Sequence, residues 1–282
     1  MSASDEQVND SGQSHGQFGE DRILQEIFGE KPEGYCVEIG AYDGRTGSAT
    51  YLFEQRGWHC LLVEPNPALV EEIRKHRACT VVNCAVSNKE GTASFFVAEN
   101  VEEMSTLDLT PDRLEWIEQV GGAVKEVTVR TATLDSLLAE AAFPEIQFIT
   151  IDVEGHEMEV LEGFTLEVHR PRIVIIEDNS ASDDPRARGG DPRVGRHMSE
   201  HGYVHFRRTG VNEWYAHESD TELVRPDEIR RFRRAKARQH WQRQGKFLAN
   251  RIATRVGAYL PTSLKRRLRA PFDHLRSKRS QR

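Results

Sequence analysis

The sequence predicts an α/β fold in which a parallel sheet is covered by helices. Short apolar stretches alternate with segments of helical spacing, which is the pattern of βα units. Residues 172–177 form the most apolar of these stretches, and such runs belong to strands that are covered on both faces. The first strand, residues 35–39, leads into a turn between Gly40 and Gly44. Ligands of open α/β sheets bind beyond the carboxyl ends of the strands, so this turn marks a candidate site.

The individual elements follow from apolar spacing and from glycine and proline punctuation. Helices are expected at residues 23–28, 50–55, 68–76, 111–120, 133–138 and 194–201, with another around residues 160–161. Strands are expected at residues 35–39, 60–64, 80–86, 91–97, 126–131, 146–152, 172–177, 203–207 and 213–217. The polar insert 99–122 is either a lid or a surface excursion, and residues 186–192 are expected to form a loop.

Length and composition suit one α/β domain with additions, or two small domains. The chain has 282 residues, of which 38% are hydrophobic, and no apolar run approaches the ~18 residues of a membrane span. The polar, acidic start predicts that no secretory signal is present. Four cysteines lie in or beside predicted strands without a C-x-x-C pair: Cys36, Cys60, Cys79 and Cys84. This usage predicts buried, reduced thiols in a cytoplasmic protein and disfavours a zinc site.

The net charge of -7 conceals two parts of opposite sign. From Pro226 to the end there are 18 Lys and Arg against 3 Asp and Glu, whereas residues 1–225 hold 20 against 42. The parts therefore carry +15 and -22 and are interpreted separately. We expect a disordered N-terminus at residues 1–15, a folded domain at 16–225 and a basic helical C-terminal extension at 226–282.

Four predicted strands end in an acidic residue: Glu38, Glu64, Asp152 and Glu177. Parallel strands point the same way, so these acids should converge at one edge of the sheet. Unpaired charge near a core is costly, which makes four accidental placements hard to explain. Glu64 has the position of the acid that accepts hydrogen bonds from ribose hydroxyls, although it could instead cap the helix after Pro65.

The turn after the first strand does not match a dinucleotide-binding fingerprint. Tyr42 stands where the second glycine of that pattern would fall. Glu38 and Asp43 make the turn acidic, which would repel a pyrophosphate but would suit a cationic ligand rich in hydroxyls. Farther upstream, Gln17 and Asp21 stand at the mouth of the first helix, where a capping role is the alternative to ligand binding.

Six segments together resemble the FkbM family of S-adenosylmethionine-dependent methyltransferases. In chain order they are residues 16–21, 37–44, 62–66, 83–87, 131–135 and 151–157. The last of them, Asp152-Val153-Glu154-Gly155-His156-Glu157 after a buried strand, is the most specific. The resemblance covers about residues 14–180, and Tyr42 stands where family members often have Asn.

The resemblance implies a Rossmann-like class I methyltransferase sheet with helices on both faces and an antiparallel strand at one edge. It implies S-adenosylmethionine as the cofactor, whose positively charged sulfonium suits an acidic pocket. The implied or candidate cofactor contacts are Gln17 and Asp21 in the first segment, Glu38, Gly40 and Asp43 along the methionine part, Glu64 at the ribose, Asn83 and Ala85 near the adenine, and Asp152 at the sulfonium and the acceptor.

Methyl transfer to a hydroxyl gains from a base. The candidates are Asp152, Glu154 and His156. A histidine has an unperturbed pKa of ~6.5, which suits general-base work, but His156 begins a helix and could serve as its cap. Glu177 could assist, or could pair with Arg170 or Arg172. Two or three of the acids could instead hold a divalent cation, and no metal ligand is assigned.

The resemblance implies O-methylation of a hydroxyl on a sugar, a glycolipid or a secondary metabolite. The alternatives are a nicotinamide-dependent oxidoreductase and a non-catalytic cofactor-binding module whose basic tail is the working part. Apolar residues among the cations of the tail, such as Trp241, Phe247 and Ile252, favour a membrane surface over nucleic acid. The tail could also pack on the acidic body or on a dimer partner. We therefore expect a cytoplasmic enzyme with a small-molecule or glycan acceptor, which could contact the inner face of a membrane.

Overall fold

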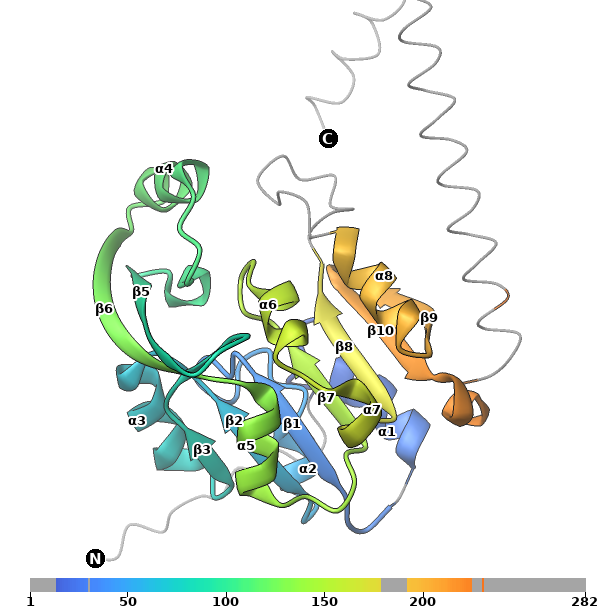
Figure 1. Ribbon diagram of the computed structural model, residues 1–282. Coiled ribbons are helices and arrows are strands. Elements are labelled where there is room, and N and C mark those ends of the chain that lie inside the picture. Colours follow the sequence, from blue (N-terminus) through green and yellow to red (C-terminus); the bar gives the residue numbers. More distant parts are fainter. Residues whose placement is uncertain (1–13, 30, 179–191, 225–229, 231–282) are drawn as a thin grey trace, which may run out of the picture. The chain divides into compact units, whose positions relative to one another are not determined.

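A seven-stranded sheet forms the centre of the protein in the computed structural model, which describes residues 14–29, 31–178, 192–224 and 230 (Figure 1). The strand order is β3-β2-β1-β7-β8-β10-β9. The bounds are β1 (Tyr35–Ile39), β2 (His59–Val63), β3 (Thr80–Val82), β7 (Phe148–Ile151), β8 (Ile173–Glu177), β9 (Tyr203–Thr209) and β10 (Asn212–His217).

The first five strands of this order are parallel, and β10 runs antiparallel to both of its neighbours. The parallel sheet predicted from the sequence is therefore confirmed. The antiparallel strand lies one position inside the edge, because β9 pairs on its outer side and occupies the edge itself.

Helices cover both faces of the sheet, as predicted. Successive residues of a strand point to opposite faces, so Val37 and Ile39 of β1 enter one apolar cluster and Cys36 the other. The first cluster is completed by α5 (Leu134–Ala141), α6 (Glu157–Glu162), α7 (Leu166–His169) and α8 (Pro192–Glu200). The second is completed by α1 (Glu20–Phe28), α2 (Tyr51–Glu54) and α3 (Pro67–His76). Of these helices, only the short α7 was not expected from the sequence.

Local capping chemistry explains where several helices begin. The Asn66 side chain accepts a hydrogen bond from the backbone N–H of Ala68 at 3.1 Å, and Pro67 occupies the first turn of α3. Thr133 caps α5 through a 3.2 Å bond from the N–H of Ser136. The nearby Asp135 carboxylate instead accepts from the N–H of Thr165 in a different segment, at 2.7 Å.

The prediction of one continuous strand at residues 80–86 is wrong, because two strands of different sheets occupy this stretch. β3 ends at Val82, and β4 (Ala85–Val86) belongs to a separate three-stranded sheet of order β4-β6-β5. Between them the Asn83 amide donates to the backbone carbonyls of Glu64 and Pro65 at 2.9 and 3.0 Å. These bonds tie the chain to the end of β2 at the point where it leaves the large sheet.

The insert extends from the small sheet. The insert joins two strands of that sheet, β5 (Gly91–Glu99) and β6 (Ala123–Ala132), which pair antiparallel along their length. The insert contains the short helix η1 (Glu102–Met104) and α4 (Pro111–Gln119), with α4 at its tip (Figure 1). The backbones of Phe96 and Thr106 also pair, which folds the insert back on β5.

Several expectations lie outside the described residues: disorder at 1–13, the loop at 186–191 and, apart from Arg230, the helical extension at 226–282. Ser14 Oγ and the backbone N–H of His15 are described and donate hydrogen bonds to the Asp21 carboxylate at 2.6 and 2.8 Å, and the expected disorder of residues 1–15 stays a prediction. Within the described part of the chain, no helix combines the length and the apolar character that a membrane crossing requires.

Candidate functional site

A cavity of about 1530 Å³ lies beyond the carboxyl ends of the parallel strands. All four strand-end acids line it, namely Glu38, Glu64, Asp152 and Glu177. Their convergence follows from the common direction of β1, β2, β7 and β8, as expected from the sequence. Single small-molecule sites usually occupy ~300–1,000 Å³, so this cavity has room for two ligands side by side.

Glu64 follows β2 and is only 4% exposed. One oxygen accepts from the N–H of Tyr42 at 3.0 Å and the other from the N–H of Asn66 at 2.8 Å. Burial raises the pKa of Glu64 to about 7, against the lowering effect of these two bonds. Because an ionised carboxylate offers about four acceptor positions, Glu64 retains capacity for a pair of hydroxyls in the cavity.

Gly40 brings the ends of β1 and β7 together. It has a φ of 82°, and a Cβ at this position would overlap the carbonyl oxygen of Asp152. Only glycine adopts this conformation readily and leaves the required space. The glycine that the sequence places beside a ligand therefore also lets the backbone after β7 approach β1.

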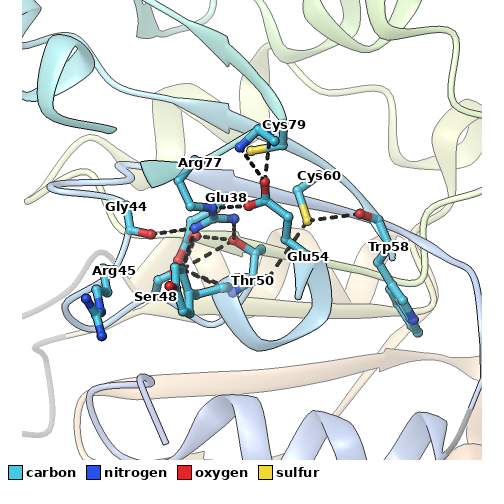
Figure 2. A network of polar contacts seen from close by, with 12 residues as sticks. Glu38, Gly44, Arg45, Ser48, Thr50, Glu54, Trp58, Cys60, Arg77 and Cys79 are labelled. Carbon is cyan, nitrogen blue, oxygen red and sulfur yellow. Dashed lines mark hydrogen bonds and ion pairs between the residues drawn. The ribbon is translucent and has the colours of Figure 1, made fainter. Parts of the chain in front are cut away.

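Glu38 is held by the loop that follows β1. Its carboxylate accepts from Ser48 Oγ at 2.7 Å, Thr50 Oγ1 at 2.5 Å and the N–H of Ala49 at 3.0 Å. Figure 2 shows that this group belongs to a wider network centred on Arg77. Three of the four acceptor positions of Glu38 are thus taken by the chain, which leaves one for a ligand.

Arg77 lies behind this loop with a fully buried side chain. It pairs with Glu54 and donates to the carbonyl of Gly44 at 2.5 Å and to Thr50 Oγ1 at 3.0 Å (Figure 2). Sequence reasoning did not find Arg77, because a basic residue just after a helix is typical of a solvated surface. The network fixes residues 44–50, and Gly47, Ser48 and Ala49 from this stretch line the cavity.

Acidic groups gather after β7 and β8. One carboxylate oxygen from each of Asp152, Glu154 and Glu177 lies within 4.8 Å of the others. Burial, together with the charges of Glu177 and Glu154, raises the pKa of Asp152 well above its usual range. Burial and Glu177 also raise the pKa of Glu154 to about 8, although Arg113 opposes the shift through a 3.1 Å ion pair. The Glu154 carboxyl can therefore exchange a proton near neutral pH.

Both ring nitrogens of His156 contact a neighbouring side chain. Nδ1 lies 2.5 Å from Asp108 Oδ2, and Nε2 lies 3.0 Å from the hydroxyl of the buried Ser87. Burial favours the neutral ring, but the hydrogen bond and the charge of Asp108 outweigh it and raise the pKa of His156. To act as a base, His156 would have to give up one of these two contacts.

The N-terminal segment, residues 14–20, contributes His15, Gly16, Gln17, Phe18 and Glu20 to the rim of the cavity. Its Glu20 carboxylate accepts from Thr209 Oγ1 at 2.7 Å and from the Asn212 amide at 3.0 Å. A Cβ on Gly210 would overlap the ring of Phe18, so the turn between β9 and β10 fits closely against this segment. Gln17, a predicted cofactor contact, lines the cavity.

Three of the predicted cofactor contacts do not line the cavity: Asp21, Asp43 and Asn83. Asp21 bonds the N-terminal segment, and Asn83 bonds the end of β2. Asp43 accepts from the N–H groups of Arg45 and Thr46 at 2.8 and 2.7 Å, which stabilises its own turn. Their roles toward a cofactor stay predictions. The other predicted residues, including Gly40, Ala85 and Asp152, do line the cavity.

The insert supplies lining residues that sequence reasoning did not single out, among them Asp108, Arg113 and Trp116. Thr110 caps α4, a helix expected from the sequence at residues 111–120. Nothing in the local pattern shows that α4 returns to the loop after β7, because that contact joins residues more than 40 positions apart.

Comparison with known proteins gives a family. The methyltransferase FkbM domain matches residues 38–205. The chain is also 35% identical over 57 residues to the hexuronic acid methyltransferase AglP of Haloferax volcanii. That match spans 20% of this chain and 24% of AglP, about a quarter of its length.

Solved methyltransferase structures are similar at low identity. A precorrin-6y C5,15-methyltransferase from Geobacter metallireducens has a TM-score of 0.35 and 10% identity, and covers 73% of this chain and 93% of its own. An S-adenosylmethionine-dependent methyltransferase from Aquifex aeolicus has a TM-score of 0.33 and 15% identity, and the match covers 70% of this chain and 89% of the Aquifex chain. The family match spans more than half of the chain and agrees with the resemblance seen in the sequence motifs. The chain therefore belongs to the methyltransferase FkbM domain family, whose cofactor is S-adenosylmethionine.

Proposed function

We propose that this protein is an S-adenosylmethionine-dependent O-methyltransferase that acts on a hydroxyl of a sugar or a sugar-like acceptor. The observation that carries the proposal is Glu64, a buried carboxylate with free acceptor capacity beside a cavity lined by acids. When bound, the cofactor supplies a methyl group on a cationic sulfonium, and this group passes to the acceptor oxygen as the carbon–sulfur bond breaks and leaves its electron pair on sulfur.

The residues present fit this cofactor. Glu64 would accept from the two ribose hydroxyls, and Ala85 would lie near the adenine. The remaining position of Glu38 and the carboxyl of Asp152 would attract the positively charged methionine end, since opposite charges interact strongly where water is excluded. A pyrophosphate would meet the same acids unfavourably, which is the physical objection to a nicotinamide dinucleotide.

Asp152 is the base that the contacts favour. Burial and the neighbouring Glu177 raise the pKa of Asp152, which makes its ionised form a stronger base than an ordinary carboxylate. The ionised carboxylate would take the proton of the acceptor hydroxyl while the oxygen lone pair forms the new bond to carbon. Glu154 is already paired with Arg113, and His156 with Asp108 and Ser87.

The sugar class of the acceptor rests on two supports. The similar protein AglP is named for a hexuronic acid. In addition, the cavity offers carboxylates that accept from hydroxyls, together with Trp116, whose flat ring suits the apolar face of a sugar.

Calorimetry with S-adenosylmethionine and with NAD tests the cofactor on the intact protein. Loss of a hydrogen bond to a charged group costs ~1.5–3 kcal/mol, so Glu64→Ala should weaken S-adenosylmethionine binding by about tenfold or more. Glu71→Ala, which changes an exposed acid on α3, should not alter the affinity. Equal affinity in the Glu64 variant and the unchanged protein would refute the ribose role. Binding of NAD in place of S-adenosylmethionine would support an oxidoreductase.

Turnover with a panel of glycosides, amino sugars and glycolipids then tests the reaction. Cofactor binding without methyl transfer to any of them would favour the non-catalytic module. Asp152→Asn should lower kcat by more than 100-fold, because proton transfer to a positioned group contributes ~10²–10⁴-fold.

Peripheral membrane contact through residues 226–282 is a separate proposal, supported by their charge of +15. It predicts sedimentation with anionic vesicles, but not with neutral ones. Equal sedimentation of a chain that ends at Arg225 would refute it.

A further inference from the structure

The insert is fixed against the acidic loop that follows β7. Asp108 contacts His156, Arg113 pairs with Glu154 at 3.1 Å, and Thr106 Oγ1 donates to the Glu154 carbonyl at 3.0 Å. Three contacts from separate parts of the insert thus join it to the residues nearest the proposed reaction. Since Glu38, Glu64 and Ala85 lie on the side proposed for the cofactor, the insert is the wall that faces the acceptor.

This wall is strongly negative. Of the described residues that line the cavity, eleven are Asp or Glu and one, Arg113, is Lys or Arg. Three of the eleven acids, Glu64, Asp152 and Glu154, have raised pKa values, and so has His156, which also lines the cavity. Arg113 is already paired with Glu154. The insert itself contributes Glu102, Glu103 and Asp108, together with two acids from α4.

The negative charge of the insert affects Tyr42, on another side of the cavity. Burial, followed by the charges of Glu103, Asp43 and Glu102, raises the pKa of Tyr42, a residue of the turn after β1. The cavity between the insert and this turn is therefore exposed to the field of the two insert glutamates. One sulfonium supplies a single positive charge, whereas the insert alone contributes five acidic residues to the lining of the cavity.

We propose that the acceptor is a neutral or positively charged polyol, such as a neutral glycoside or an amino sugar, and that the insert excludes acidic sugars and sugar phosphates. The inference rests on the proposed methyltransferase function and specifies its substrate class, which would differ in charge from the hexuronic acid for which the similar protein AglP is named. An anionic acceptor would enter the negative field and find Arg113 occupied. A hydroxyl or ammonium group would instead donate to the carboxylates, while Met104, Leu107 and Trp116 provide apolar contact.

The local potential can be measured without knowing the acceptor. A cysteine at Met104, on the cavity side of the insert, is reacted with cationic, neutral and anionic methanethiosulfonates. The reference site is Val168→Cys, at a residue 73% exposed on α7, and the unsubstituted chain gives the background of its four cysteines. After normalisation to the reference, the cationic reagent should react about tenfold faster than the anionic one at 0.1 M salt, with a smaller ratio at 1 M.

Replacing Glu102 and Glu103 by Gln in the same background should reduce this ratio, whereas Glu71→Gln, on α3, should not. A normalised ratio of one or below would overturn the proposal, and so would a higher kcat/KM for a glucuronide than for the matching glucoside. Because the labelling requires neither cofactor nor turnover, it stands apart from the calorimetry above. Failure to bind S-adenosylmethionine would refute the proposed function, and loss of the charge ratio would refute only the acceptor class.

Discussion

Replacing Arg77 by Met should destabilise the protein more than any other single loss of positive charge in the described domain. The guanidinium is fully buried, pairs with Glu54 and donates to Gly44 and Thr50. Removing one partner of a buried ion pair leaves the other charge uncompensated and typically costs ~3–5 kcal/mol. A domain of this size loses ~2–4 °C of melting temperature for each kcal/mol, so a fall of about 6–20 °C is expected.

The matched control is Arg74→Met, one turn earlier on α3. Arg74 pairs with Glu71 at 2.8 Å, but both side chains are at least half exposed. Exposed pairs contribute ~0–1 kcal/mol, because water screens them. Urea unfolding followed by circular dichroism, together with calorimetry, measures both variants.

The outcome that refutes this reasoning is a free energy of unfolding for Arg77→Met within about 1 kcal/mol of that for Arg74→Met. A further check is Arg77→Met combined with Glu54→Leu. If the uncompensated carboxylate causes the loss, the double variant should recover part of the stability, and the cycle gives the coupling energy of the pair.

Two further outcomes are expected. Gly40→Ala should lower the free energy of unfolding much more than Gly19→Ala does. Both glycines have a φ of 82°. A Cβ at Gly40 would overlap Asp152, whereas a Cβ at Gly19 would have no atom within 4 Å. Equal losses would show that φ alone matters, at ~1–2 kcal/mol each. Burial raises the pKa values of Glu64 and Glu157 to about 7. Between about pH 4.5 and 7 the folded state therefore holds protons that the unfolded state has lost, so stability should fall as pH rises through this window. Urea unfolding at pH 5.5 and 7.5 measures this fall in the free energy of unfolding. In Glu64→Gln the free energy of unfolding should fall less steeply, by up to ~1.4 kcal/mol per pH unit. An unchanged pH dependence would contradict the raised pKa of Glu64.

The strand-end acids show what can be predicted from the sequence. Glu64 and Asp152 follow buried apolar runs, and the common direction of parallel strands brings them to one edge whatever the intervening loops do. The register of β1 with β2 and β7 then aligns the ends of all three strands. The fold class and the place of the cavity therefore follow from the order of strands and acids along the chain.

Contacts set by tertiary packing could not be predicted in this way. Asp108 reaches His156 because the insert folds back, and no periodicity encodes that return. Asp43 illustrates a second limit, since a short acid in a turn can bond its own backbone or a ligand, and the two uses have the same sequence pattern. Asn83 marks a third, because a β-branched run indicates strand without indicating which sheet each residue joins.

The bonds from Glu20 to Thr209 and Asn212 have a consequence for biosynthesis. They join residues 189 and 192 positions apart, so the first turn of the domain meets its partner only after nearly the whole domain has been made. At ~5–20 residues per second, a ribosome needs roughly 10–40 s to cover that distance. Contacts of such long range also form slowly once both partners exist. The contacts between the N-terminal rim of the cavity and the final hairpin can consequently form only late in synthesis.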